Sequence, residues 1–229
     1  MSKEQILCEK QNSILERLDK LKHRLDQITA SDKVTANQQK IADLCKSISL
    51  ESQLVRVPPP YYDWKLEQRA SYLRAPSKDH LCKSLIMENT ECQHTSTKDP
   101  LNSRYYCIII QYTSKIQANK INRFLKNLNK NNDLKFNLSL APPEISQQLT
   151  GFEYNAVAPL GTNVPIPIII SKKIMELAHN GKVWLGGGEI DLKLVVDIQH
   201  FKEKMEQTGL KVFTSDVIFD NDSNDDEDF

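Results

Sequence analysis

The chain has 229 residues, enough for one domain of ordinary size and an appendage, and 39% of them are hydrophobic, which is enough to form a core. Thirty Lys and Arg residues balance thirty Asp and Glu residues, so the formal net charge is zero. The sequence therefore lacks the overall basic excess that favours general nucleic-acid binding, and only a local patch could provide one.

The cysteines do not form a disulfide framework or a standard zinc motif. They are odd in number and include no CxxC pair: Cys8, Cys45, Cys82, Cys92 and Cys107. Reduced thiols are the expectation. The first residues contain no apolar region of a signal peptide, and no run approaches the ~18 apolar residues of a membrane span. These features predict a soluble, cytoplasmic protein, with nuclear entry left open.

The first 57 residues have helical spacing. Apolar side chains alternate at intervals of four and three, interrupted once by a glutamine: Leu7, Gln11, Ile14, Leu18, Leu21, Leu25 and Ile28. This is the seam of a coiled coil. A second, shorter helix is expected over Val34 to Ile48. The seam predicts a homodimer or docking to a partner. The alternative is a helical hairpin that folds on itself or on the domain.

Three consecutive prolines, Pro58 to Pro60, favour an extended connector. We place the domain boundary there, which gives a helical extension over 1–57 and a domain over 58–215. The final stretch, 216–229, ends in DSNDDEDF and is expected to be a disordered acidic tail.

Helices and strands follow one another irregularly in the domain. The patterns predict helices over 65–74, from 76, and over 115–130, 143–151, 171–178 and 197–206; they predict strands over 84–87, 105–112, 134–140, 166–170, 183–185, 192–196 and 210–213. This mixture, without an internal repeat, favours an α+β domain with a mixed sheet.

The helix over 115–130 carries a basic stripe. Lys120, Arg123, Lys126 and Lys130 recur at intervals of three, three and four, so they share one face. Such a stripe can lie against phosphates, or it can be the solvated face of a helix packed on a sheet.

Sequence motifs for phosphate loops, dinucleotide binding, zinc proteases and serine hydrolases are absent. His80 and His94 each lie two residues from a cysteine, Cys82 and Cys92, but the pairs lack standard zinc spacing, so we expect no metal. Cys82 and Cys107 lie in apolar runs and are expected to be buried.

Two glycine-bearing stretches and one lysine are the candidate parts of a pocket. The loop from Gly151 to Gly161, GFEYNAVAPLG, precedes the apolar run PIPIII and can expose its backbone to a ligand. Gly186 to Gly188 interrupt a good strand, which indicates either a structural bulge or close approach by a ligand. Lys83 stands at the entrance of the strand over 84–87.

Three stretches in this order, CKSLIMEN, GFEYNAVAPLGTNVPIPIII and VWLGGGEIDLKLVV, resemble the YbaK/prolyl-tRNA synthetase-associated domain, a family of aminoacyl-tRNA deacylases. The resemblance covers roughly residues 60–215. Lys83-Ser84 matches the lysine that opens a strand in the family, Asn155 to Gly161 match its loop, and Gly186 to Gly188 match its glycine turn. The free-standing form with an N-terminal coiled coil is the branch that this chain looks like.

The resemblance implies a mixed, partly barrel-like sheet flanked by helices, and a site that needs no cofactor and no metal. It implies Lys83 as the catalytic residue, acting as oxyanion stabiliser, phosphate anchor or base. It also implies these substrate-binding residues: Asn155, Ala156, Val157, Pro159, Gly161, Gly186, Gly187 and Gly188. Relatives usually have glycine where this chain has Asn155 and Ala156. Asparagine tolerates a left-handed backbone, so we expect the loop to keep its shape, while Ala156 should narrow the amino-acid pocket.

The function implied is trans-editing, the hydrolysis of the ester of a mischarged tRNA for translation fidelity. One candidate substrate is tRNA-Pro carrying a small amino acid. Two other functions compete with it. One is a non-catalytic tRNA- or synthetase-binding module of a multi-synthetase assembly, and the other is a structural coiled-coil adaptor.

Overall fold

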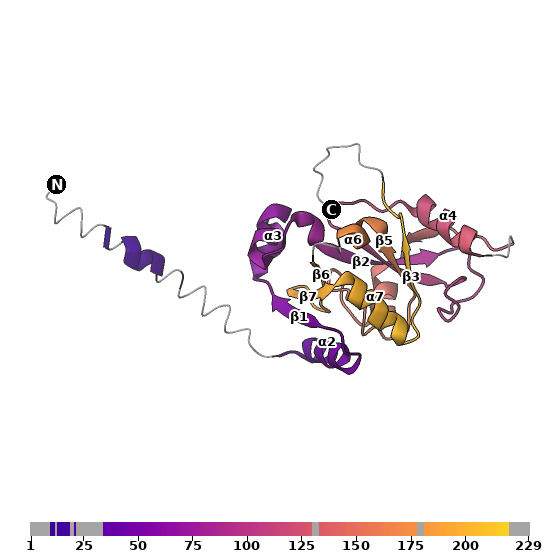
Figure 1. Ribbon diagram of the computed structural model, residues 1–229, viewed down its shortest axis with the longest axis horizontal. Coiled ribbons are helices and arrows are strands. Elements are labelled where there is room, and N and C mark those ends of the chain that lie inside the picture. Colours follow the sequence, from indigo (N-terminus) through magenta and orange to yellow (C-terminus); the bar gives the residue numbers. More distant parts are fainter. Residues whose placement is uncertain are drawn as a thin grey trace. The chain divides into compact units, whose positions relative to one another are not determined.

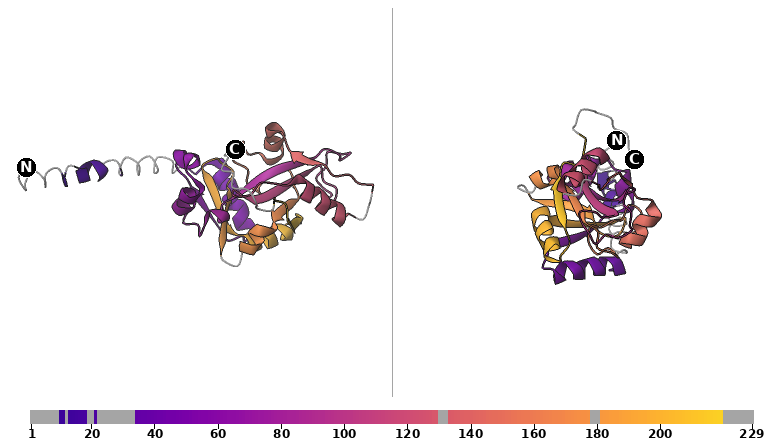
Figure 2. Two further views of the ribbon diagram at one scale, coloured as in Figure 1. Left: turned by 90° about the horizontal axis from the view of Figure 1, so that it is seen from above. Right: turned by 90° about the vertical axis from the view of Figure 1, so that its right-hand side faces the viewer.

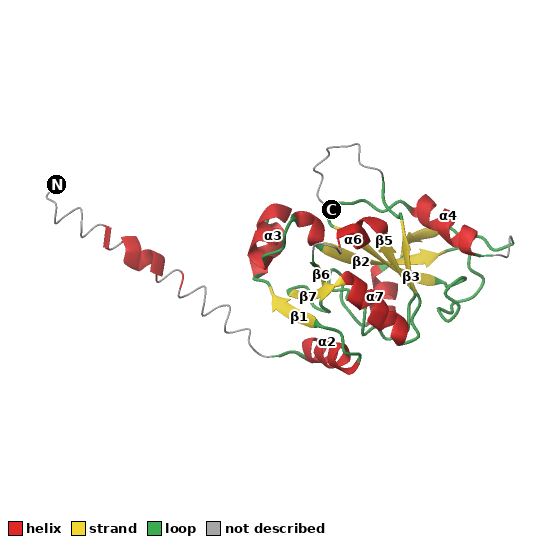
Figure 3. Ribbon diagram, viewed as in Figure 1, coloured by secondary structure: helices red, strands yellow, loops and turns green. Residues whose placement is uncertain are grey.

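A computed structural model of the chain describes residues 10–11, 13–18, 21, 34–129, 133–177 and 181–219. The chain divides into two compact units, Met1–Thr35 and Ala36–Phe229. The second unit holds all the named helices and strands, which can be followed in Figure 1. Figure 3 shows its strands gathered centrally, with helices around them.

The strands form two sheets. The three-stranded sheet has the order β1-β7-β6 and is antiparallel throughout; its strands are β1 (Ser52–Arg56), β6 (Lys182–Gly186) and β7 (Leu192–Asp197). The five-stranded sheet has the order β4-β2-β3-β5-β8, with strands β2 (Cys82–Asn89), β3 (Tyr105–Gln111), β4 (Leu138–Leu140), β5 (Ile168–Ser171) and β8 (Val212–Ser215). β2 pairs antiparallel with β3 and β4, whereas β5 pairs parallel with β3 and β8, so this sheet is mixed. The fold class is α+β, with mixed sheets flanked by helices.

Three apolar clusters hold the layers together. The largest lies between inward-facing residues of both sheets, such as Ile109 and Leu194, and helices α2 (Ala36–Ser47), α6 (Lys172–Leu177) and α7 (Ile198–Gln207). A second joins the other face of the five-stranded sheet to α4 (Ala118–Leu128). The third joins the other face of the three-stranded sheet to the 3-10 helix η1 (Pro59–Asp63) and to α3 (Leu66–Leu73). Burial of these faces is the main stabilising contribution.

Local signals explain where several helices begin and end. Helix α5 (Pro143–Thr150) starts with proline in its first turn and ends at Gly151, whose left-handed backbone (φ 78°) serves as the cap. Asp197 caps α7 through a hydrogen bond that its side chain accepts from the His200 amide. Gly151 and Asp197 therefore explain why these two helices end and begin near the predicted bounds.

Other elements differ from the expectation. Of the three prolines expected to be extended, Pro58 is, but Pro59 and Pro60 open η1 instead. The expected helix from residue 76 is the short 3-10 helix η2 (Lys78–His80), and the strand expected over 134–140 is confined to β4. Each altered element is short, and its form depends on the tertiary contacts around it.

The expected domain boundary at Pro58 lies inside the compact unit, which begins at Ala36. Helix α2 buries Ile41 and Cys45 in the largest core, and β1 pairs with β7 along its whole length. Figure 2 shows α2 as the purple helix along one edge of the domain. Residues 36–57 are therefore part of the fold rather than an extension of it, a correction that the pairing with β7 explains.

The coiled-coil seam falls largely outside the described residues. Residues 10–11, 13–18 and 21 are helical, and three seam side chains among them are more than half exposed: Ile14, Leu18 and Leu21. Leu7, Leu25 and Ile28 lie outside the described residues. The acidic tail lies mostly outside them as well, from residue 220 onward. No helix among the described residues is both long enough and apolar enough to cross a membrane.

Candidate active site

A cleft of about 2400 Å³ opens at the start of β2. β4 pairs only with Met87 to Asn89 at the far end of β2, so one edge of the first residues of β2 carries no partner from β4. A single bridge, from Leu81 to Trp184, joins the beginning of β2 to β6. Lys83 lies two residues after Leu81, on β2, and Gly186 lies two residues after Trp184, on β6. Both line the cleft. The cleft therefore lies where the two sheets diverge.

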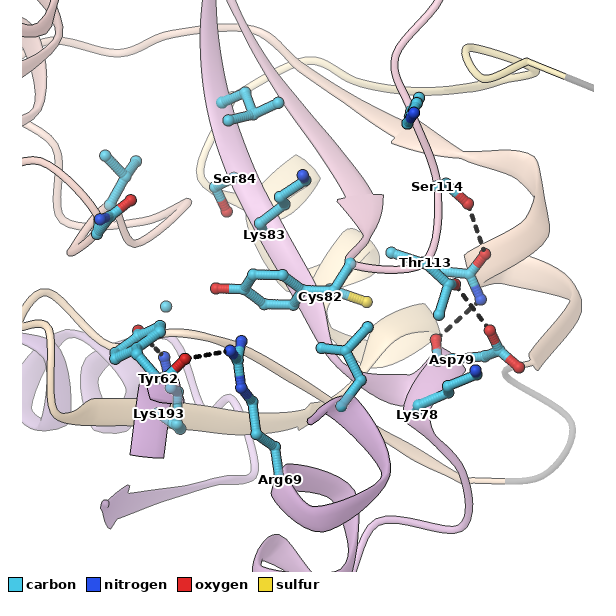
Figure 4. Close-up of a pocket in the computed structure, with 18 of the residues that line it drawn as sticks. Tyr62, Arg69, Lys78, Asp79, Cys82, Lys83, Ser84, Thr113, Ser114 and Lys193 are labelled. Atoms are coloured by element: carbon cyan, nitrogen blue, oxygen red, sulfur yellow. Dashed lines mark hydrogen bonds between the residues drawn. The ribbon is translucent and has the colours of Figure 1, made fainter. Parts of the chain in front are cut away.

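Lys83 faces this cleft from β2 (Figure 4). It is half-buried, and its ammonium lies 5.7 Å from the centre of the Tyr112 ring. Among the described residues it forms no ion pair. Burial lowers its pKa from the ordinary value for lysine. An unpaired, partly desolvated ammonium can stabilise a developing negative charge, and the amine that it forms at a higher pH can act as a base.

The neighbouring Ser84 adds a second polar group to the cleft. Its side chain is 7% exposed, and its hydroxyl has no hydrogen-bond partner among the described residues. A buried hydroxyl without a partner is costly, so a ligand that bonded it would regain that free energy. Successive side chains of a strand point to opposite faces, and Ser84 shares its face with the core residues Cys82 and Ile86. The Ser84 hydroxyl and the Lys83 ammonium therefore project from opposite faces of β2.

The loop around Asn155 also lines the cleft. Asn155 and Val157 line the cleft, and Asn155 has a left-handed backbone (φ 64°), as the sequence predicted for an asparagine in place of glycine. A β-carbon at Gly186 would lie 2.2 Å from the Val157 carbonyl oxygen. Glycine at 186 is therefore what allows the loop to lie against β6.

The other residues expected to bind substrate do not line the cleft. Ala156, 1% exposed, packs in the largest core, so its methyl group does not narrow the pocket as expected, and Pro159 is buried as well. The three remaining glycines pack against protein: a β-carbon would meet Ile41 at Gly161 (3.0 Å), Leu192 at Gly187 (2.9 Å) and Phe152 at Gly188 (2.9 Å). These glycines serve close packing and tight turns.

A second basic group in the cleft was not singled out from the sequence. Lys193 on β7 is 4% exposed and lines the cleft opposite Gly186 in the strand register. Its ammonium donates a hydrogen bond to the Tyr62 hydroxyl and lies over the rings of Tyr61 (5.3 Å) and Tyr62 (4.7 Å). Burial, and then the positive charge of Arg69, lower the pKa of Lys193 to about 8, against an opposing effect of Asp191.

Arg69 on α3 completes this group, which we call the Lys193 cluster: Lys193, Arg69, Tyr61 and Tyr62. The guanidinium of Arg69 lies 5.5 Å and 5.3 Å from the Tyr61 and Tyr62 ring centres and donates to the Tyr62 and Trp64 carbonyl oxygens. Figure 4 shows Tyr62, Arg69 and Lys193 together, at a different part of the cleft from Lys83. A lysine inside the apolar run LKLVV was the signal in the sequence, because it is unusual to bury lysine there without a role.

The basic stripe on α4 is divided. Lys120 pairs with Asp216 at 2.7 Å, so its charge is already matched. Arg123 and Lys126 border a separate, shallower hollow. Lys130 lies outside the described residues. The proposed contact of this stripe with tRNA phosphates therefore depends on Arg123 and Lys126, and it remains a prediction.

Four cysteines lie among the described residues and are buried, Cys82 and Cys107 as predicted, together with Cys45 and Cys92. Cys92 lies 3.6 Å from His94 Nδ1, whereas His80 interacts with the Ser77 hydroxyl. Within the described ranges, no group of three or more His, Cys, Asp or Glu side chains is placed to hold a metal ion.

No protein-family model and no curated protein matches the chain. Solved structures do. A candidate trans-editing enzyme for prolyl-tRNA synthetase shares 18% identity at a TM-score of 0.60, covering 81% of this chain and 99% of that one. A hypothetical protein shares 20% identity at a TM-score of 0.57, covering 79% of this chain and 99% of that one. A scaffold protein from a study of epitope grafting shares 15% identity at a TM-score of 0.60, covering 82% of this chain and 99% of that one. At these identities, what the chain shares with the three structures is the fold.

Proposed function

We propose that the protein is a trans-editing aminoacyl-tRNA deacylase, with Lys83 as its catalytic residue. The observation that carries the proposal is the position of Lys83: a half-buried ammonium, without an ion pair among the described residues, in a cleft that Asn155 and Val157 also line. The fold shared with a candidate trans-editing enzyme for prolyl-tRNA synthetase supports the same activity. The three stretches of sequence that resemble the deacylase family support it independently.

The reaction needs few protein groups. Water adds to the ester carbonyl carbon, the bond to the ribose oxygen breaks, and that oxygen takes up a proton. The carbonyl oxygen becomes negative on the way, and the Lys83 ammonium lines the cleft in which the ester would lie. Stabilising that oxygen is the role that we assign to Lys83. The backbone from Asn155 to Val157 would hold the aminoacyl group, with tRNA-Pro carrying a small amino acid as the first substrate to test.

A panel of mischarged tRNAs tests the proposal. The panel should include alanine, serine, threonine and cysteine esters of tRNA-Pro and of other tRNAs. The wild-type protein should release the amino acid from at least one, and Lys83→Ala should slow this release by about 100-fold or more, the scale of losing one oxyanion donor. Lys182→Ala, an exposed lysine on β6 outside the cleft, is the matched control.

Two results would count against this function. If Lys83→Ala kept full activity, Lys83 would not be catalytic. If no ester were hydrolysed but the tRNA were bound, the protein would be the non-catalytic tRNA- or synthetase-binding module instead.

We also propose that the helical residues before Ala36 tether the enzyme to a second copy or to a synthetase assembly, which would raise the local concentration of substrate. Deleting residues 1–33 should change the molar mass in light scattering or abolish partner binding, and should leave hydrolysis intact. Unchanged mass together with an intact partner complex would contradict the tether.

A further inference from the structure

The Lys193 cluster has features of a ligand site that packing alone does not explain. An ammonium has three donors, and among the described residues Lys193 makes one hydrogen bond, to Tyr62. It forms no ion pair there, and Asp191, the acid that raises its pKa, is paired with Arg56 at 2.9 Å. Burying a cation in this way is unfavourable unless a partner arrives.

The neighbourhood of Lys193 increases that cost rather than relieving it. Arg69 lies over the same two tyrosine rings, so two positive charges share one aromatic platform. The hydroxyl of Tyr62 donates to the Ile190 carbonyl oxygen, which leaves its lone pairs for Lys193 and fixes its position. Two like charges held close together favour an anion between or beside them.

The cluster connects with the rest of the cleft through aromatic side chains. The Tyr112 ring lies under the Lys83 ammonium, and burial, followed by the effect of Tyr112, raises the pKa of Tyr62. Trp64 lines the cleft beside Tyr62, and its ring stacks at a tilt on Tyr72 (5.4 Å). Basic groups combined with aromatic faces are the usual means of binding single-stranded nucleic acid, because phosphates meet the cations while bases stack on the rings.

The charges that line the cleft agree with this reading. Seven basic side chains line it: Lys65, Arg69, Lys78, Lys83, Lys115, Lys173 and Lys193. Four acidic side chains also line the cleft: Asp63, Glu67, Asp79 and Glu176. Glu67 is paired with Lys78 and Glu176 with Lys172, and Asp79 accepts a hydrogen bond from Thr113, so three of the four acids are engaged. The cleft thus carries a positive excess that the neutral chain as a whole does not.

We propose that the Lys193 cluster binds a phosphate group of a single-stranded RNA 3′ end, with a base stacked on the neighbouring aromatic side chains. This inference rests on the proposed function for the identity of the RNA. It divides the work in the cleft: Lys193 and Arg69 hold the backbone, and Lys83 is left to act on the ester. Lys193 is then a binding residue rather than a catalytic one.

The test measures binding of a fluorescent 5′-ACCA-3′ oligonucleotide by anisotropy at several salt concentrations. Lys193→Met should weaken binding about tenfold or more and reduce the salt slope by about 0.7, the value for one phosphate contact on a single strand. Lys193→Arg should restore most of the affinity, and Lys182→Met should bind as the wild type does. Arg69→Gln is the second variant, and circular dichroism melting checks that each variant is folded.

Competition identifies the group that is recognised. Adenosine monophosphate should displace the oligonucleotide at concentrations at which adenosine does not. Displacement by inorganic phosphate as effective as that by the monophosphate would overturn the role of the aromatic platform. Wild-type affinity and salt slope in folded Lys193→Met and Arg69→Gln would overturn the phosphate site itself.

The outcome is separable from that of the proposed function. If no mischarged tRNA is hydrolysed but oligonucleotide binding depends on Lys193, the phosphate site stands and the deacylase fails. If hydrolysis depends on Lys83 but oligonucleotide binding is indifferent to Lys193 and Arg69, the deacylase stands and the phosphate site fails.

Discussion

Lys83 and Lys193 line the same cleft in opposite surroundings. Lys83 is half-buried beside one ring, Tyr112, whereas Lys193 is almost fully buried over two rings and near a second cation, Arg69. Burial lowers the pKa of both, but only Lys193 has a hydrogen-bond acceptor among the described residues. The hydrogen bond holds the Lys193 ammonium in place, which is suited to binding a group that is charged throughout the reaction. The Lys83 ammonium is suited to stabilising a negative charge that develops only in the transition state.

The comparison is sharpest in the kinetics of the two Met variants. Lys83→Met should lower kcat by about 100-fold or more, because the interaction that it removes is made in the transition state. Lys193→Met should raise KM about tenfold with kcat nearly unchanged, because backbone binding contributes equally before and during reaction. Steady-state deacylation of one mischarged tRNA measures both. Equal effects on kcat would erase the proposed division between the two lysines.

Gly186 lies opposite Lys193 and tests whether the two walls depend on each other. Gly186→Ala would drive a methyl group into the Val157 carbonyl oxygen, and backbone atoms cannot turn aside as a side chain can. The free energy of unfolding should fall by roughly 1–3 kcal/mol, and deacylation should fall further than stability alone explains. Urea unfolding and the tRNA assay measure the two effects. A variant as stable and active as wild type would show that the loop can move away freely.

Lys193→Met and Lys83→Met should each lower activity but raise the free energy of unfolding. At pH 7 Lys193→Met should raise the free energy of unfolding by roughly 1–3 kcal/mol, because a buried charge is replaced by an apolar group. Since the pKa of Lys193 is about 8 when folded and 10.5 ordinarily, this cost is fully present below pH 8 and disappears as the pH rises toward 10.5. The advantage of the variant should therefore narrow over that range. Lys83→Met should raise the free energy of unfolding by less, because Lys83 is only half-buried. Urea unfolding at several pH values measures the difference between each variant and the wild type.

The pH dependence of function gives the smallest effect. Oligonucleotide affinity should fall roughly tenfold between pH 7 and pH 9, as the Lys193 ammonium, which faces Arg69, Tyr61, Tyr62 and Asp191, loses its proton. The hydrolytic rate reports on Lys83 instead. If the ammonium acts, kcat falls as the pH rises through its lowered pKa, and if the amine acts as a base, kcat rises there. A flat affinity profile in the wild type would contradict the role given to Lys193.

The sequence predicted what local chemistry controls. Gly151 and Asp197 cap helices through their own backbone or side chain, and apolar runs mark β3 and β5, so these elements could be read directly. Lys83, Asn155, Val157 and Gly186 were predicted for one pocket, and all four line it.

What the sequence could not predict depends on distant partners. The segment SQLVR becomes strand β1 because β7, far along the chain, offers it an edge. A glycine at 161 or 188 indicates that another group lies close to the backbone, but the sequence does not identify that group. It is the Ile41 side chain at Gly161 and the Phe152 side chain at Gly188. Lys193 escaped notice because only the fold brings Tyr62 and Arg69 around it.

The pairing of β1 with β7 also determines how the protein can be dissected. A fragment starting at Pro58 would expose the whole edge of β7 and would leave the pocket for Ile41 empty in the core. Bare strand edges recruit other chains, so such a fragment is expected to aggregate. Its insolubility would then be mistaken for a requirement for the coiled segment. A cut just before Ala36 avoids this, because it keeps β7 covered while removing the exposed leucines of the first unit.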